Sequence, residues 1–523
     1  FADDVARMVG DESFSIHGRK GEYMLRSLEI LGILSGRYEK ERLEKLWKLL
    51  LINQFHDILP GTSIHEAIEN TREEYKELKK EGAELKAHCF EALNKAVAPS
   101  YEAVTVWNMC SHPVTGVVSV DAPFENAVLK DCGGKEVLFE TINENGKSRL
   151  LFLAQNVPAV GYKIYKLEKV ENKASINVIA SENSLENEYL SVKLDGDGNI
   201  LSVFDKENGR EVLSGVGNLL TISHDKPIHE SAWNLENDYK MKMTELKAAK
   251  SVRVLESSPL RGVIETVRKY NQSTITQKII LNAASRTLDF DTTVDWHERE
   301  KVLKAEFPVN IRARYSTFEI AHGALQRPTY ANNSYEKAMF ECCAHKWTDL
   351  SEGDYGVSLL NDCKYGYDLF DNVMRITLMR GPICPDPKGD IGISTFKYSL
   401  YPHKGVWSEA GTVHEAFKLN IPLEAFVTEN GCGTFNEKSF FTLDKSNVII
   451  DAVKKAQDEN GIIVRVYEAE GKHSDVYLSL PFKGIKVTDC NLMEENASSR
   501  KSDDAGFMFS IKPFEVLTFR IEF

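Results

Sequence analysis

The sequence of 523 residues lacks the patterns by which several large classes of protein are recognised. It has no stretch of about 18 apolar residues that would span a membrane, and its start lacks the basic and then apolar layout of a secretory signal. The formal net charge is −14, and no cluster of Lys and Arg interrupts the acidic balance. Phosphate binding needs such clusters. We therefore expect neither a nucleic-acid partner nor a membrane partner.

Cysteine and histidine also lack the spacings of known frameworks. The nine cysteines, an odd count, are irregularly spaced and form neither a disulfide framework nor paired zinc clips. The 13 histidines include no His-x-x-x-His pair. Phosphate-binding glycine loops and the Gly-x-Ser-x-Gly nucleophile elbow are absent. The unpatterned cysteines predict a reducing, cytoplasmic location. A homodimer is a separate candidate for the oligomeric state.

The composition that remains, 42% hydrophobic and 27% charged, is typical of a globular protein with more than one core. Helical periodicity ends near Pro99, and short strand-like runs follow it. The predicted fold class is α then all-β, with several domains. We expect a remnant of an upstream region, a three-helix antiparallel bundle, a small β-domain, a large β-sandwich and a C-terminal β-domain, at residues 1–20, 21–97, 98–167, 168–423 and 424–523.

The stretch from Asn53 to Ser63, which reads NQFHDILPGTS, stands out from its surroundings. Apolar residues over 41–56 predict a helix that is buried on two sides, and Pro60 and Gly61 are expected to end it. His56 would then project from the buried face. One interpretation makes it a core histidine that is hydrogen-bonded to a neighbour, and the other makes it a metal ligand beside a functional Asp57.

A pair of acids at Asp386 and Asp390 is the other local candidate for chemistry. Glycoside hydrolysis uses two carboxyl groups, one as nucleophile or base and one as acid. The stretch 385–390, which reads PDPKGD and contains both acids, also has the composition of a tight turn. The local sequence favours the turn.

Several stretches, in order along about 500 residues, resemble glycoside hydrolase family 38, the α-mannosidases. The stretch at 53–63 resembles the signature helix of that family, and 21–29 resembles its first bundle helix. Weaker similarities follow at 184–189, 225–227 with 232–233, 295–298, 307–308, 323 with 327–328, 361–367, 401–403 and 512–515.

The resemblance implies a retaining, exo-acting α-mannosidase with one zinc ion. It implies that His56 is a zinc ligand and that Asp57 contacts hydroxyls of the terminal mannose. It also suggests that Arg380 lies near the sugar, although an arginine in a surface ion pair is the alternative. Zinc would bind vicinal sugar hydroxyls while an aspartate forms the glycosyl-enzyme intermediate.

In the family the remaining zinc ligands, the nucleophile and the acid belong to an N-terminal β/α domain. No counterpart of that domain occurs in this sequence. The chain opens with Phe1 rather than Met. We therefore expect the C-terminal part of such an enzyme, inactive by itself. The alternatives are a non-catalytic carbohydrate-binding or interaction module, and a His-Asp metallohydrolase that is complete within the chain.

Overall fold

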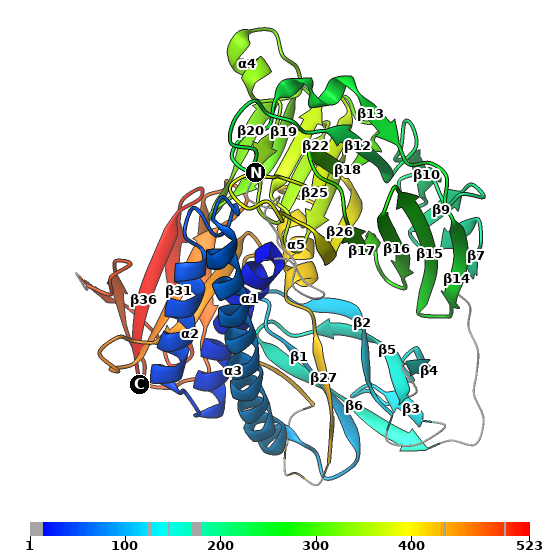
Figure 1. Cartoon of the computed structure of the whole chain (residues 1–523). Coiled ribbons are helices and arrows are strands. Elements are labelled where there is room, and N and C mark those ends of the chain that lie inside the picture. Colours follow the sequence, from blue (N-terminus) through cyan, green and yellow to red (C-terminus); the bar gives the residue numbers. More distant parts are fainter. Residues whose placement is uncertain are drawn as a thin grey trace. The chain divides into compact units, whose positions relative to one another are not determined.

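The computed structural model describes residues 14–122, 127–144, 147–169, 179–429, 431, 433, 436–495 and 498–523. The chain forms two compact units, each assembled from separated stretches. Helices come first along the chain and strands make up most of the rest (Figure 1). This order confirms the predicted α then all-β class, whereas the division into five domains stays a prediction. The first unit contains Phe1–Glu22, Lys48–Lys79 and Val178–Asn420, and the second contains Tyr23–Trp47, Lys80–Asn177 and Ile421–Phe523.

Three helices open the described chain: α1 (Phe14–Ser35), α2 (Lys40–Asn53) and α3 (His65–Val97). Each helix begins in one unit and ends in the other. Helix α1 begins at Phe14, within the stretch 1–20 that we expected to precede the bundle. It ends before Gly36, which has the left-handed φ of 69° that favours glycine. The three predicted helices are therefore confirmed, and the predicted start of the first is wrong.

The contacts between the helices show that neighbours run antiparallel. In the first unit Asn53 of α2 donates to Glu74 of α3 at 2.7 Å, and in the second Arg42 pairs with Glu81 at 2.9 Å. Residues later in α2 therefore contact residues earlier in α3, so the two helices run in opposite directions. At Gly21 of α1, a Cβ atom would come within 3.1 Å of a methyl group of Leu50 and 3.3 Å of one of Leu78. This packing confirms the antiparallel bundle.

The two-sided burial that we predicted for α2 is wrong. One face is buried, with Leu43, Leu46 and Leu50 at 4% exposure or less. The next two residues, Leu51 and Ile52, are 59% and 63% exposed. An apolar count along the sequence does not tell a core face from an apolar surface, and here the second apolar set lies on the surface.

The first unit also contains three antiparallel sheets and two short helices. The expected absence of helix from 168–423 is wrong in two places, at α4 (Ser334–Ala338) and α5 (Thr412–Asn420). The nine-stranded sheet has the order β14 (Ser251–Ser257), β15 (Arg261–Tyr270), β16 (Ser273–Asn282), β17 (Leu288–Trp296), β26 (Gly392–Lys404), β23 (Tyr355–Asn361), β22 (Trp347–Ser351), β19 (Tyr315–Ile320) and β20 (Gly323–Pro328).

The other two sheets of this unit are smaller. The six-stranded sheet has the order β13 (Met243–Glu245), β12 (Leu219–His224), β18 (Lys301–Pro308), β25 (Val373–Arg380), β24 (Gly366–Phe370) and β21 (Cys342–Cys343). The five-stranded sheet has the order β11 (Arg210–Glu211), β10 (Ile200–Asp205), β9 (Leu190–Leu194), β8 (Ser184–Glu186) and β7 (Ile179–Ser181).

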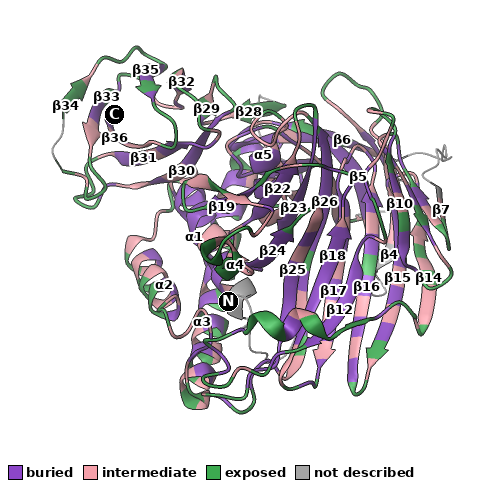
Figure 2. Ribbon diagram, turned by 90° about the horizontal axis from the view of Figure 1, so that it is seen from above, coloured by how far each residue is buried: buried purple, intermediate pink, exposed green. Residues whose placement is uncertain are grey.

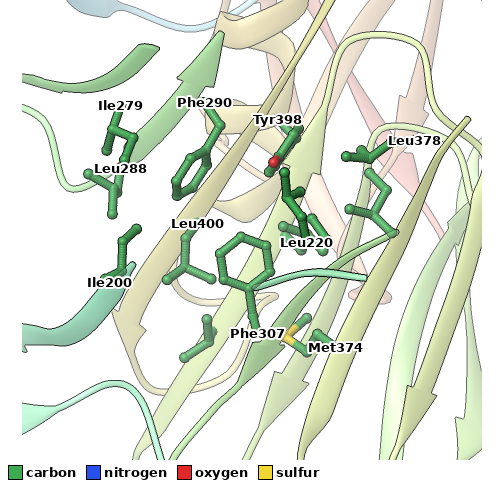
Figure 3. Close-up of a cluster of buried hydrophobic side chains, with 14 of the residues drawn as sticks. Ile200, Leu220, Ile279, Leu288, Phe290, Phe307, Met374, Leu378, Tyr398 and Leu400 are labelled. Atoms are coloured by element: carbon green, nitrogen blue, oxygen red, sulfur yellow. The ribbon is translucent and has the colours of Figure 1, made fainter. Parts of the chain in front are cut away.

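One hydrophobic core joins these sheets. Strand β17 alternates buried and half-buried residues along its whole length, as a strand with one face in a core does. Phe290 of β17, Phe307 of β18 and Tyr398 of β26 pack together, with the ring centroids of Phe290 and Tyr398 5.0 Å apart (Figure 3). Strands β18 and β25 are buried on both faces (Figure 2). Buried polar side chains on these strands include Lys304 and Glu306 of β18 and Thr377 of β25, and β25 ends at Arg380.

The second unit is built from four antiparallel sheets and the other parts of the three helices. The first sheet has the order β27 (Glu424–Thr428), β1 (Ala103–Asn108), β6 (Gly161–Lys169) and β28 (Glu437–Ser439), and β3 (Ala127–Lys130) also pairs with β6. Two three-stranded sheets have the orders β2 (Val114–Asp121), β5 (Lys147–Val157), β4 (Phe139–Glu144) and β29 (Thr442–Leu443), β32 (Ser474–Ser479), β35 (Gly506–Ile511). The last sheet has the order β30 (Val448–Lys455), β31 (Ile462–Glu468), β36 (Val516–Glu522), β33 (Lys486–Cys490) and β34 (Ser498–Arg500). In the described part of the chain, every helix is too short or too polar to cross a bilayer.

Candidate functional site

The connection between α2 and α3, residues 54–64, carries the two strongest candidates, His56 and Asp57. It is a chain of tight turns rather than a continuation of the helix. Backbone amides donate three residues back, from Gln54 to Leu51 and from Phe55 to Ile52, each at 3.2 Å. Such bonds tighten the last helical turn and change the direction of the side chains. The prediction that residues 41–56 form one helix is therefore wrong after Asn53.

His56 lies on the surface, with 78% of its side chain exposed, so the predicted burial of this histidine is wrong. Its Nε2 atom is 3.5 Å from Oδ2 of Asp57. The hydroxyl of Thr62 donates to the other carboxylate oxygen, Oδ1, at 3.0 Å. The ring of Phe55 stacks obliquely on the imidazole at a centroid distance of 4.2 Å. A nitrogen and a carboxylate oxygen are thus presented together to solvent.

Hydrogen bonds fix the entrance of this connection. The amide of Asn53 is buried and donates to the backbone oxygen of Leu49 at 2.9 Å and to the Glu74 carboxylate of α3 at 2.7 Å. The amide of Gln54 donates to the Glu22 carboxylate of α1. Further along, Gly61 has a φ of 65°, the left-handed conformation that glycine was predicted to supply. Helix α3 begins at His65, two residues after Ser63.

Arg380, the last residue of β25, is fully buried, so the surface ion pair that we considered for it is wrong. Its Nε donates to Oδ2 of Asp225 at 2.6 Å. One terminal nitrogen donates to the backbone oxygens of Ser231 at 2.9 Å and Asn234 at 2.7 Å. Burial raises the pKa of Asp225, and the Arg380 guanidinium opposes that shift. The predicted contact of Arg380 with a sugar stays a prediction, and it requires the covering segment to move.

Asp386 and Asp390 both lie in the loop after β25 and are both about 1% exposed. Asp386 accepts from the backbone amide of Lys388 at 2.7 Å, and its own backbone oxygen accepts from Gly389 at 3.2 Å. These contacts confirm the interpretation of this sequence as a turn. The Asp386 carboxylate also contacts Nδ1 of His65 at 3.0 Å.

Sequence reasoning missed two of these pairings. Asp225 lies in a stretch that resembled the family, but nothing in its spacing indicated Arg380 as its partner, 155 positions away. His65 was not singled out at all. Both pairs bring together segments that are far apart in the sequence, and only the sheet topology determines which segments become neighbours.

Several other residues of the resembling stretches support the fold. Asn361, at the end of β23, accepts from the backbone amides of Cys363 at 2.8 Å and Lys364 at 2.6 Å, and from Arg19 at 2.9 Å. Glu298 accepts from the hydroxyl of Ser273 at 3.0 Å. These polar groups are buried and hydrogen-bonded, as interior polar groups require.

A metal ion would find part of a site here. An accessible imidazole nitrogen beside a carboxylate oxygen fits zinc, which binds both kinds of ligand. Among the residues that the structure describes, no group of three or more His, Cys, Asp or Glu side chains is arranged to hold a metal. His56 therefore fits as one member of a ligand set, with the Asp57 carboxylate beside it.

Three family models match the chain in order. They are the alpha mannosidase middle domain over residues 15–93, the glycosyl hydrolases family 38 C-terminal domain over 185–388 and the glycosyl hydrolases family 38 C-terminal beta sandwich domain over 447–519. The first range contains His56 and Asp57, and the second contains Asp225, Arg380 and Asp386.

Known proteins agree with these matches. Alpha-mannosidase 2C1 of Mus musculus is 30% identical over 95% of this chain, and alpha-mannosidase G of Dictyostelium discoideum is 30% identical over 92%. The chain spans about half of each relative, 48%. The crystal structure of an alpha-mannosidase from Enterococcus faecalis V583 has the same fold, with a TM-score of 0.82 at 18% identity over 99% of this chain and 68% of that one. The chain therefore belongs to the α-mannosidases of glycoside hydrolase family 38, of which it contains the middle and C-terminal domains.

Proposed function

We propose that the chain is the C-terminal part of a retaining, exo-acting, zinc-dependent α-mannosidase of the cytoplasm, and that it is inactive alone. The observation that carries the proposal is the accessible His56–Asp57 pair within a chain that belongs to the α-mannosidase family. Several described cysteines, among them Cys89, Cys132 and Cys363, are free thiols, which supports a reducing compartment. The substrates would be terminal α-mannosides.

The pair His56 and Asp57 would supply one side of the site. His56 would hold zinc through a ring nitrogen, and the ion would act as a Lewis acid toward vicinal sugar hydroxyls. Asp57 would accept hydrogen bonds from the mannose hydroxyls. The Thr62 hydroxyl holds one of its oxygens at 3.0 Å and so fixes the plane of the carboxylate. The nucleophile, the acid and the other zinc ligands would come from polypeptide outside the described residues.

The surface around the pair supports the same proposal. Four large apolar side chains on and beside the connection are more than half exposed, namely Leu51, Ile52, Phe55 and Ile64. Apolar patches of this kind commonly mark surfaces that another part of a protein covers. A zinc-ligand candidate on the same connection as exposed apolar side chains fits a contact with a domain that would supply the other ligands.

The test uses the longer polypeptide that contains this chain, with a chromogenic α-mannoside and measured zinc content. His56→Ala should reduce zinc content and lower kcat/KM by a factor of about 10³ or more, because it removes a direct metal ligand. His88→Ala is the matched control, since His88 is a half-exposed histidine of α3. It should change neither quantity.

Two outcomes would contradict the proposal. Zinc-dependent hydrolysis by the purified 523-residue chain would show that the chain contains a complete site. Glycan binding that survives both His56→Ala and chelation would favour a carbohydrate-binding module instead. The mass of the native protein, measured intact, distinguishes a longer enzyme from a separate module.

A further inference from the structure

Resting on the proposed function, we propose that His65 and Asp386 are positioning residues that anchor the connection carrying His56 and Asp57. The imidazole Nδ1 of His65 lies 3.0 Å from Oδ2 of Asp386. His65 is the first residue of α3, and the connection ends directly before it. The pair therefore fixes the exit of a segment whose entrance is fixed by Asn53 and Gln54.

Asp386 is suited to be a rigid anchor because its own position is determined on several sides. It is 1% exposed, and its second carboxylate oxygen accepts from the backbone amide of Lys388 at 2.7 Å. Its backbone oxygen accepts from Gly389 at 3.2 Å. A buried carboxyl group that accepts a backbone amide keeps its orientation, so it offers the imidazole a fixed partner.

The anchor connects through a hydrogen-bonded path to the buried arginine. The backbone amides of Ile383 and Cys384 both donate to the Ser231 hydroxyl at 2.9 Å. The backbone oxygen of Ser231 accepts from Arg380 at 2.9 Å. The loop that presents Asp386 is thus held on the segment that covers Arg380. One network determines the places of the arginine and of the connection.

Two further charged groups face His65. Lys388 lies on its other ring nitrogen, with Nζ 3.3 Å from Nε2, and Glu69 lies 3.6 Å from the same nitrogen. The side chains of Lys388 and Glu69 are exposed to solvent, whereas Asp386 is buried. The contacts with Asp386 and Lys388 both join α3 to the loop after β25, whereas Glu69 belongs to the same helix as His65. Glu69 therefore serves as the control, because its contact with His65 is local to α3.

The first experiment measures backbone hydrogen exchange of the 523-residue chain by mass spectrometry. His65→Ala should accelerate exchange across residues 54–64 about 10-fold, because loss of a hydrogen bond to a buried carboxyl group changes the opening equilibrium by that order. Exchange in β17 and β26 should not change. His65→Asn, which places an amide N–H near the former Nδ1, should restore most of the protection, and Glu69→Gln should leave it as in the wild type.

The second experiment measures zinc affinity and kinetics in the longer polypeptide. His65→Ala should weaken zinc binding about 10- to 100-fold, as loss of a residue that orients a metal ligand does, and His65→Asn should recover it. Unchanged exchange in residues 54–64, or equal acceleration in the sheet, would overturn the anchor. Faster exchange with unchanged zinc affinity would keep the anchor as a structural device and would remove its role in the proposed site.

Discussion

Arg380, predicted to lie near the sugar, and His56, predicted to bind zinc, lie in opposite settings within one unit. The guanidinium of Arg380 is sealed, and its donors meet a carboxylate and two backbone oxygens. The imidazole of His56 is open, and nearby polar contacts come from its own short connection. A buried charge must find its partners inside the fold, whereas an exposed one does not. The sealed group therefore supports the fold, and the open group is available to a ligand.

The difference between buried and exposed charges is tested most directly at Asp225. Asp225→Ala would leave the Arg380 guanidinium buried without its carboxylate, and we expect a loss of about 3–5 kcal/mol in the free energy of unfolding. Urea denaturation followed by circular dichroism measures this loss. The matched control is Glu207→Ala, which breaks an exposed pair with Arg286 and should cost less than about 1 kcal/mol. Equal losses in the two variants would show that burial does not separate these ion pairs.

Adjacent leucines at the end of α2 test the same contrast without charge. Leu50 is fully buried and Leu51 is 59% exposed. Leu50→Ala should lower the free energy of unfolding by about 3 kcal/mol, because it removes buried methyl groups and leaves a cavity beside Gly21. Leu51→Ala should change it by less than about 0.5 kcal/mol. Thermal unfolding of both variants measures the difference, and comparable losses would mean that Leu51 is covered in the isolated chain.

A buried acid in the second unit, Glu29, tests the effect of burial on a single carboxyl group. Burial raises its pKa to about 7, although the nearby Lys454 and hydrogen bonds from Trp47 and Tyr38 oppose the shift. Between the ordinary value of 4.5 and about 7, the folded protein keeps a proton that the unfolded chain has released. Stability should therefore fall as pH rises through this window, by roughly 2–3 kcal/mol.

Glu29→Gln should remove that slope, because the amide keeps an acceptor oxygen for Trp47 without a charge. Urea denaturation at several pH values between 5 and 8 measures the slope in the wild type and the variant. Glu73→Gln alters an exposed carboxylate that pairs with Lys76, and its slope should match the wild type. A Glu29→Gln profile parallel to the wild type would show that the acid is charged in the fold.

Most of the fold was predictable because its signals are local. Alternation of apolar and polar residues identified strands such as β17, and the turn sequences at Gly198 and Gly209 adopt the left-handed φ values, 70° and 62°, that glycine permits. The three helices were found from periodicity. Helices α4 and α5 were missed because a helix of 5 or 9 residues offers too few turns for a periodic signal.

The candidate site was less predictable. Periodicity extended α2 past Asn53, although tight turns begin there, and so it placed His56 on the wrong face. The role of His56 came from the resemblance of residues 53–63 to a family, since its geometry depends on turns. The pairings of Arg380 with Asp225 and of His65 with Asp386 depend on contacts between distant segments. Sequence spacing carries no signal for contacts of that kind.

The assembly of each unit from separated stretches has a consequence for synthesis on the ribosome. The first unit has all of its residues once Asn420 has been made, but the second also needs Ile421–Phe523. At about 5–20 residues per second, that last stretch takes about 5–20 s. During this time β1 lacks β27, the strand that pairs with one of its edges. Conditions that slow translation of the last stretch would therefore lengthen the exposure of an unfinished β-sheet to aggregation.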